Sequence, residues 1–279
     1  MGQVSGTGMD ESTVLILFAV TVVGLLVGSF LNVVIARVPQ GGSVVRPRSR
    51  CPGCDSPIAP RDNIPLLSWL LLAGKCRSCL KPIPMVYPLV EAGTGLGWLA
   101  VGLWAVGDPE RWWIAPLALA WVSAGIALLV IDIQHHRLPN ALVYPMYPIT
   151  VVGLMLADVG AGQSPWSSVI GGALLWVVPL GLIYVLTRGR GMGLGDVKIA
   201  VPLGATLGWF GMPVALVGLI GAFVLGALVG VIALTRSSWA AGNRVRRIAF
   251  GPFLLAGAAA SAVWGASLWQ GYVTFVGLA

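Results

Sequence analysis

The stretch TVLILFAVTVVGLLVGSFLNVVIA, residues 13–36, decides the fold class, because it is long, apolar and free of charged side chains. A helix of about 20 apolar residues crosses the hydrocarbon core of a bilayer, which is about 30 Å thick. The rest of the chain has the same character: 57% of its 279 residues are hydrophobic, 10% are charged, and the mean hydropathy is +0.88. The alternation that a lipid-facing barrel needs is absent from the sequence, which leaves helices as the spanning structure.

Further apolar stretches follow the first one, and together they predict an all-α polytopic membrane protein with about eight transmembrane helices. They lie near 13–36, 86–107, 112–132, 141–158, 166–187, 197–211, 213–235 and 249–275. The division of 197–235 into two spans depends on the GWFGMP break at 208–213, and each piece is near the lower length limit.

The distribution of basic residues predicts the orientation of these spans. All of the 17 Lys and Arg residues except Arg111 fall in alternate loops, and the 37–85 segment holds the largest group. By the positive-inside rule, both termini lie outside and the 37–85 segment is cytoplasmic. The first span lacks the flanks of a cleaved signal peptide and is expected to be a retained anchor. The net charge of +7 is explained by topology and lipid headgroups, so no nucleic-acid partner is expected.

All four cysteines lie in the polar 37–85 segment. They form two CxxC knuckles, Cys51 with Cys54 and Cys76 with Cys79, separated by a spacing typical of one tetrahedral zinc site. Two disulfides are the competing interpretation, but a cytoplasmic loop is in a reducing environment. Four thiolates leave no open position for a substrate, so the zinc is expected to be structural and to stabilise a segment too small to form its own core.

Two aspartates stand at the inner edges of apolar stretches, Asp132 in LVIDIQHHRLPN (129–140) and Asp196 in RGMGLGDVKIA (190–200). A carboxylate at membrane depth costs several kcal/mol unless it is paired, hydrated or used. A lone GxGD string is more often a glycine-rich loop with a solvated Asp. A second acid at a helix end on the same membrane face reverses that preference, and the pair suggests a carboxylate dyad that shares one proton.

Other polar residues receive structural interpretations. His135 and His136 are expected to be a solvated pair and not metal ligands, since adjacent residues point in different directions. Glu91 is expected to be a buried hydrogen-bonding or charge-pairing residue that supports the fold, with a substrate contact as the less favoured alternative. Lys198 either biases the ionisation of Asp196 or extends to the interface. The apolar run within 61–75 is too short to span and is expected to lie against the membrane.

Several of these segments together resemble the type IV prepilin peptidases, which are membrane aspartic peptidases of the GxGD type. They are CPGC (51–54), RDNIPLLSW (61–69), GKCRSC (74–79), YPLVE (87–91), VIDIQHHRLPN (130–140) and GMGLGDVK (191–198). The resemblance extends from GSFLNVVIARVP at residue 28 to FGPFLLAG at residue 257. The family commonly has a further acid at the position of Asn140, and this departure leaves Asp132 as the only carboxylate of its motif.

The resemblance implies that Asp132 and Asp196 are catalytic, and that the protein removes the short basic leader of type IV prepilins or pseudopilins at the cytoplasmic face of the cell inner membrane. It also implies methylation of the new amino terminus with S-adenosylmethionine. The expected organisation is a first transmembrane segment (1–36), a four-cysteine insertion (37–85) and a peptidase core (86–279).

Two functions of other classes compete with a peptidase. The first is a proton- or cation-coupled transporter that uses Asp132 and Asp196, for which repeat symmetry would be expected, and no repeat is visible in the sequence. The second is a zinc-knuckle scaffold that recruits cytoplasmic partners to the membrane. Loss of the aspartates would abolish a peptidase and leave such a scaffold intact.

Overall fold

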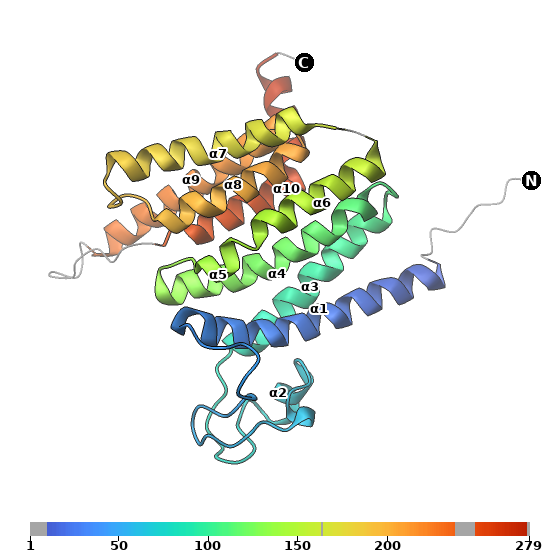
Figure 1. The fold of residues 1–279 in the computed structure, drawn as a ribbon, viewed down its shortest axis with the longest axis vertical. Coiled ribbons are helices and arrows are strands. Elements are labelled where there is room, and N and C mark those ends of the chain that lie inside the picture. Colours follow the sequence, from blue (N-terminus) through green and yellow to red (C-terminus); the bar gives the residue numbers. More distant parts are fainter. Residues whose placement is uncertain (1–9, 163, 238–248, 278–279) are drawn as a thin grey trace, which may run out of the picture. The chain divides into compact units, whose positions relative to one another are not determined.

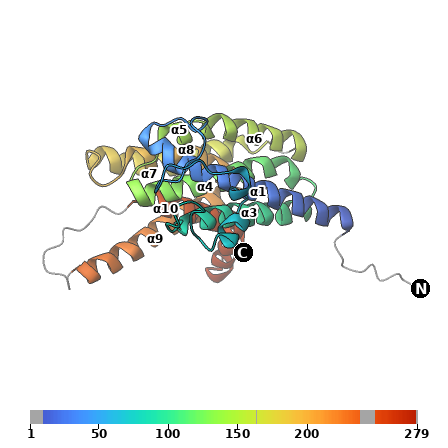
Figure 2. The ribbon, with the colours of Figure 1, turned by 90° about the horizontal axis from the view of Figure 1, so that it is seen from below.

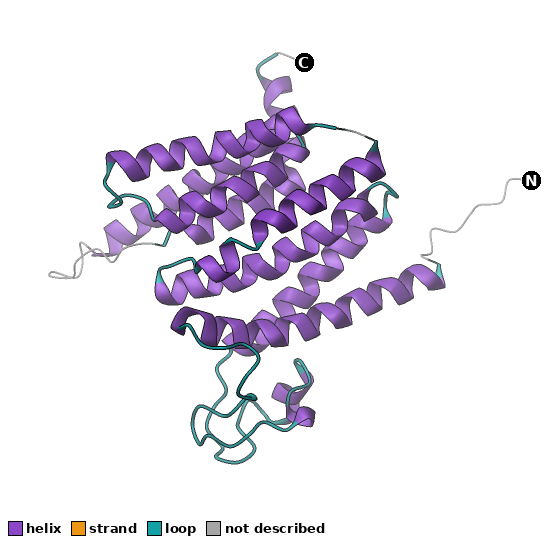
Figure 3. Ribbon diagram, viewed as in Figure 1, coloured by secondary structure: helices purple, strands orange, loops and turns teal. Residues whose placement is uncertain are grey.

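The computed structural model describes residues 10–162, 164–237 and 249–277 of the chain. Within these ranges every regular element is a helix, and the loops contain only isolated β-bridges (Figure 3). The predicted all-α class is therefore confirmed. The long helices are α1 (Glu11–Arg37), α3 (Val86–Val106), α4 (Arg111–His135), α6 (Met146–Ala161), α7 (Trp166–Leu186), α8 (Leu194–Trp209), α9 (Met212–Ser237) and α10 (Gly251–Phe275) (Figure 1).

The chain forms two compact units, one ending at Ala127 and the other beginning at Leu128. In the first unit α1 and α3 pack along each other. They approach each other closely at Gly28, where a Cβ would lie 2.7 Å from the Cα of Glu91. Carbon atoms prefer separations of about 3.5–4.0 Å, so only glycine allows the two backbones to approach so closely here.

The segment between α1 and α3 contains little regular structure. It has two 3-10 turns, η1 (Val38–Gln40) and η2 (Pro60–Asp62), and one short helix, α2 (Leu67–Leu71). The apolar run expected to lie against the membrane includes α2, where Leu70 and Leu71 are 66% and 76% exposed. An exposed leucine pair of this kind is compatible with an interfacial position.

In the second unit α8 packs against α7, α9 and α10, and also against α6 and the short helix α5 (Asn140–Val143). Half of its residues are buried, including Ile199, Leu203 and Leu207. The helices α9 and α10 lie side by side (Figures 1 and 2). The indole N–H of Trp176 on α7 donates to the Ala215 carbonyl of α9 at 2.9 Å, and this side chain is fully buried.

Glycines bring the backbones of α7 and α8 together. A Cβ on Gly204 would lie 2.8 Å from the Cβ of Trp176 and 3.0 Å from the carbonyl carbon of Gly172. A Cβ on Gly172 would in turn lie 2.8 Å from the Cα of Gly208. Small residues at helix contacts permit the close packing that holds membrane helices together.

Seven helices in the described part of the chain are long and apolar enough to cross a membrane, and many of their large apolar side chains are exposed. The protein is thus a multi-pass membrane protein. The one expected span that is not among these seven is 197–211. It corresponds to α8, which has 16 residues and is shorter than the roughly 20 that span a bilayer. A helix surrounded by other helices need not match the thickness of the lipid, which accounts for this difference.

Candidate active site

Asp132 lies in the last turn of α4 and is only 4% exposed. The helix ends directly after it, because His136 adopts a left-handed conformation with φ +51°. The N–H of His136 donates to the carbonyl of Asp132 at 2.8 Å. A left-handed residue commonly terminates a helix in this way. The local sequence thus places a buried carboxylate at the end of a helix, which is where this acid was expected to lie.

Asp196 lies in the first turn of α8 and is 7% exposed. Its carboxylate accepts a hydrogen bond from the N–H of Gly193, the N-cap residue, at 3.2 Å. This bond satisfies one of the backbone donors that the start of a helix leaves unpaired. The Asp196 side chain is therefore held by the beginning of the helix that carries it.

The two glycines of the GLGD motif are explained by space. A Cβ on Gly193 would lie 2.9 Å from Oδ2 of Asp196, and a Cβ on Gly195 would lie 3.0 Å from the Cβ of Leu138. Neither glycine is among those with positive φ. The structure therefore explains both glycines by the close approach of neighbouring atoms and not by an unusual backbone conformation.

Asp132 and Asp196 come together at the start of α10. A Cβ on Gly251, the first residue of α10, would lie 2.5 Å from Oδ2 of Asp132 and 3.4 Å from Oδ1 of Asp196. The two carboxylates cannot be farther apart than the sum of these distances, and their charges are close enough to interact. The sequence had associated Gly251 only with the family resemblance, although a glycine before a proline at a helix start was a visible signal.

Two buried carboxylates that face one space can perform acid–base chemistry together. Like charges so close cannot both be ionised at little cost, so such a pair binds one proton between its members. The shared proton titrates as a property of the pair. This is the arrangement with which aspartic peptidases activate water.

The residues that surround the two acids have mostly structural contacts. The Nζ of Lys198 donates to Oδ1 of Asn140 at 3.1 Å and lies 5.0 Å from the ring centroid of Tyr144. The ammonium group is thus directed toward α5 and the residue that follows it. Asn140 begins α5 as the first residue after Pro139. His135 is exposed, as expected for a solvated residue.

The four cysteines form one cluster in the insertion. Their sulfur atoms lie within 4.8 Å of one another, and the Sγ atoms of Cys51 and Cys79 are 3.8 Å apart. Zinc–sulfur bonds of about 2.3 Å in a tetrahedron separate the sulfurs by about 3.8 Å. A disulfide would require about 2.05 Å, and all four cysteines are free thiols in the structure. The cluster therefore fits one tetrahedral metal better than the competing pair of disulfides.

The two knuckles have the same backbone design. An isolated β-bridge closes each one, Arg50 with Pro57 and Lys75 with Pro82. The residue after the second cysteine is left-handed in both, with φ +57° at Asp55 and +59° at Leu80. Hydrogen bonds from backbone N–H groups favour the thiolate form. In the second knuckle the backbone N–H groups of Cys79 and Ser78 donate to Cys76 and lower the pKa of its thiol to about 6.

Glu91 connects the insertion to the helices of the first unit. Its carboxylate accepts from the N–H of Leu66 at 2.8 Å and from Nδ2 of Asn32 at 3.5 Å. Leu66 has a left-handed backbone with φ +59°, and strained residues of this kind persist only where the surrounding structure holds them. The expected role of Glu91 as a hydrogen-bonding residue that supports the fold agrees with these contacts.

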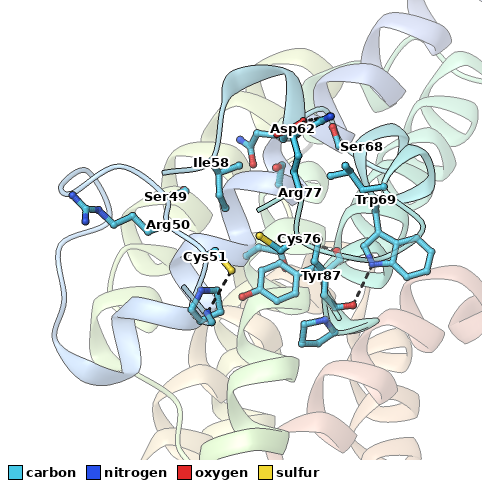
Figure 4. A pocket seen from close by; sticks show the side chains of 18 of the residues that line it. Ser49, Arg50, Cys51, Ile58, Asp62, Ser68, Trp69, Cys76, Arg77 and Tyr87 are labelled. Atoms are coloured by element: carbon cyan, nitrogen blue, oxygen red, sulfur yellow. Dashed lines mark hydrogen bonds and ion pairs between the residues drawn. The ribbon is translucent and has the colours of Figure 1, made fainter. Parts of the chain in front are cut away.

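A cavity of about 450 Å³ lies between the insertion and the adjoining ends of α1 and α3 (Figure 4). Tyr87, Trp69 and Glu91 are among the residues that line it. Figure 4 shows Tyr87 beside Cys51 and Cys76. Ligand sites typically have volumes of about 300–1,000 Å³ and combine aromatic walls with a few polar groups. The cavity is thus large enough for a small-molecule ligand.

Comparison with known proteins gives matches along most of the chain. Residues 22–105 match the model of the Bacterial Peptidase A24 N-terminal domain, and residues 117–231 match that of the Type IV leader peptidase family. Relatives from several bacteria carry the name prepilin leader peptidase/N-methyltransferase, and three of them illustrate the extent of the similarity. The one from Stutzerimonas stutzeri is 35% identical over 92% of this chain and 93% of its own length. The relative from Aeromonas hydrophila is 36% identical over 90% of this chain and 91% of its own length. The relative from Myxococcus xanthus is 42% identical over 78% of this chain and 64% of its own length.

No solved structure matches the chain significantly. The family therefore follows from the two domain models and from the identity to the curated relatives, which covers most of both chains. The chain belongs to the type IV leader peptidase family.

Proposed function

We propose that this protein is a membrane aspartic endopeptidase that removes the basic leader of type IV prepilins or pseudopilins, with Asp132 and Asp196 as its catalytic residues. The observation that carries the proposal is the convergence of two buried carboxylates, from the end of α4 and the start of α8, beside Gly251. The names of the relatives, prepilin leader peptidase/N-methyltransferase, support the same substrate class. A proton- or cation-coupled transporter is not favoured by these relatives.

In the proposed reaction one aspartate is ionised and the other is protonated. The ionised carboxylate takes a proton from water as the water oxygen attacks the scissile carbonyl, and the protonated acid donates its proton to the carbonyl oxygen. The first acid then protonates the leaving nitrogen as the C–N bond breaks. The second carboxylate recovers a proton from the hydroxyl group of the intermediate, and this step restores the dyad.

The near-isosteric variants Asp132→Asn and Asp196→Asn test this assignment. Each is expected to abolish cleavage of a leader-bearing prepilin by purified protein, because an amide can neither take nor share the proton. Circular dichroism and thermal unfolding of each variant should remain close to those of the wild type. Retention of more than a small fraction of the rate in either variant would remove that residue from the dyad.

We also propose that the four cysteines hold one structural zinc. Cys51, Cys54, Cys76 and Cys79 supply a closed set of thiolates, so the metal would fold the insertion and would take no part in peptide hydrolysis. Purified protein is expected to contain about one zinc per chain. A double Cys76→Ser and Cys79→Ser variant should lose that zinc and show increased proteolysis between α1 and α3. Metal-free protein with an intact, protease-resistant insertion would contradict the proposal.

The second part of the relatives' name supports methylation of the new amino terminus, for which we propose S-adenosylmethionine as the donor. The cavity beside the insertion has a suitable size, and its chemistry fits a cationic nucleoside: Tyr87 and Trp69 offer aromatic surfaces and Glu91 offers a carboxylate. Bound donor would supply the methyl group. Isothermal titration with S-adenosylmethionine should give saturable binding that Tyr87→Ala weakens about tenfold. The control Tyr272→Ala, on exposed surface of α10, should bind like the wild type, and equal binding by all three proteins would exclude this cavity.

The membrane orientation is part of the same proposal. We propose that the protein lies in the cell inner membrane with both termini outside and the four-cysteine insertion in the cytoplasm, because the basic residues fall in alternate loops. Its lipid contacts involve the exposed apolar faces of the spanning helices. A cysteine that replaces the exposed Val45 of the insertion should react with a membrane-impermeant maleimide, beyond the labelling of the wild type, only after the cells are opened. Reaction from outside intact cells would reverse the orientation.

A further inference from the structure

Gly251 stands at the point where the two acids meet, and its conformation does not require a glycine. Its φ is not in the left-handed region that disfavours side chains. It is the first residue of α10 and is buried. The reason for a glycine here must therefore be sought in the space around its Cα.

That space is bounded by both carboxylates. A Cβ on Gly251 would lie 2.5 Å from Oδ2 and 3.3 Å from Cγ of Asp132, and 3.4 Å from Oδ1 of Asp196. The first distance is far below a van der Waals contact between carbon and oxygen, so Asp132 would have to rotate or α10 would have to move. Any side chain at this position consequently displaces one acid relative to the other.

The backbone of Gly251 lies beside the same acid, because a Cβ built on its Cα would be 2.5 Å from Oδ2 of Asp132. The first intrahelical hydrogen bonds of α10 come from the N–H groups of Phe253 and Leu254, which donate to the carbonyl of Phe250. The N–H of Gly251 precedes them and belongs to the donors that a helix start leaves without a partner inside the helix. The next residue, Pro252, has no N–H, so Gly251 is the first residue of α10 with a backbone donor to offer.

We propose that Gly251 is a positioning residue of the peptidase site, which orients Asp132 through its backbone N–H and keeps both carboxylates facing one space because it has no side chain. This inference rests on the proposed function and goes beyond it by assigning a third residue, from a third helix, to the site. The residue does not react with the substrate. It acts through Asp132.

Three glycine-to-alanine variants separate this role from a general effect on the fold. Gly251→Ala is the test. Gly271→Ala, in the same helix, is the matched control because nothing lies within 4 Å of the added Cβ. Gly257→Ala is the packing control, since its Cβ would lie 2.7 Å from the backbone nitrogen of Ala222 in α9.

The full-length chain, reconstituted in lipid, is assayed for prepilin cleavage between pH 4 and pH 9. Gly251→Ala is expected to lower kcat about 100-fold, since displacement of a catalytic group by about 1 Å has effects of this size, while KM changes little. His136 and Asp196 are titratable neighbours of Asp132, so a displaced Asp132 should also give a pH profile different from the wild type. Gly257→Ala should lower the melting temperature and keep the wild-type profile, and Gly271→Ala should change neither.

A stability measurement tests the contact without reference to activity. Gly251→Ala is made in the wild type and in an Asp132→Ala background, where the atoms nearest the added Cβ are removed. The melting temperature should fall in the first case and be unchanged in the second, because the two positions are coupled only through direct contact. A variant that folds only in the Asp132→Ala background would support the proposal equally.

The proposal is overturned if Gly251→Ala cleaves with the kcat and pH profile of the wild type, or if it lowers the melting temperature equally in both backgrounds. These outcomes differ from failure of the peptidase assignment. In that case Asp132→Asn would remain active, while the stability coupling between Gly251 and Asp132 would persist.

Discussion

The substitution Gly204→Ala tests whether the close contact between α7 and α8 fixes the position of Asp196 in the candidate site. The added Cβ would lie 2.8 Å from the Cβ of Trp176 and 3.0 Å from the carbonyl carbon of Gly172, and closer still to the carbonyl oxygen of Gly172. Carbon atoms prefer about 3.5–4.0 Å, so the two helices must separate by roughly 0.5–1 Å at this point. Backbone atoms cannot rotate away, and overpacking of this kind costs about 1–3 kcal/mol.

The same displacement reaches Asp196, one of the two proposed catalytic residues. Asp196 lies on α8 about two helical turns before Gly204. A shift of α8 by up to about 1 Å moves this carboxylate relative to Asp132, and misplacement by that distance can lower a rate about 100-fold. Gly204→Ala is therefore expected to lower both the free energy of unfolding and the rate of prepilin cleavage.

Unfolding is followed by tryptophan fluorescence during titration of micellar protein with sodium dodecyl sulfate, and cleavage is measured on the same preparation. The matched control is Gly230→Ala in α9, where no atom lies within 4 Å of the added Cβ. It should be neutral or should stabilise the protein by up to about 1 kcal/mol, because alanine is the better helix former. Equal stabilities of Gly204→Ala and Gly230→Ala would refute the argument from packing.

Three further predictions concern two features of the insertion and, in the second unit, Asn140. Asp62, whose side chain is 12% exposed, accepts a bidentate hydrogen bond from Arg77. This bond lowers the pKa of the Asp62 carboxyl below its ordinary value of 3.8. The pair therefore stabilises the insertion at neutral pH, and this contribution is lost as the pH falls through the lowered pKa. At pH 7 Asp62→Asn should lower the melting temperature of the insertion more than Asp55→Asn, whose carboxylate is 78% exposed, and equal effects would contradict this. Leu80→Gly should raise that melting temperature and Leu80→Val should lower it, because the left-handed backbone costs a non-glycine residue about 1–2 kcal/mol; the reverse order in calorimetry would show that φ at this position is relaxed. Asn140→Ala should remove one hydrogen bond and spare most of the turnover, and a rate as low as that of the dyad variants would place this residue in the site.

The length and apolar composition of continuous stretches predicted nearly all of the long helices. The span expected near 86–107 is α3, Val86–Val106, and the span expected near 166–187 is α7, Trp166–Leu186. Such agreement is possible because lipid imposes the same requirement on every span. α8 follows this rule least, because other helices surround it and its length is set by packing against them.

The candidate site could be predicted in part. An acid in an apolar stretch is conspicuous, and Asp132 and Asp196 could be selected on that basis alone. Gly251 could not, because its importance lies in which atoms stand 2.5–3.4 Å from a Cβ that it lacks. Periodicity contains no information about contacts between helices so far apart in the chain. The reason for Gly195 was hidden in the same way, since its neighbour Leu138 belongs to a distant segment.

The matching design of the two cysteine knuckles makes them interchangeable modules. Each is a run of eight residues, from Arg50 to Pro57 and from Lys75 to Pro82, with the same bridge and the same left-handed residue. The two residues between the cysteines differ completely, Pro-Gly in one and Arg-Ser in the other. The cysteines, the bridge and the left-handed position are thus shared by both knuckles, while the two residues between the cysteines can differ. A chimera with Pro-Gly in both knuckles should keep its full zinc content while it loses the stability that the Arg77–Asp62 pair contributes, so this surface can change without loss of the metal.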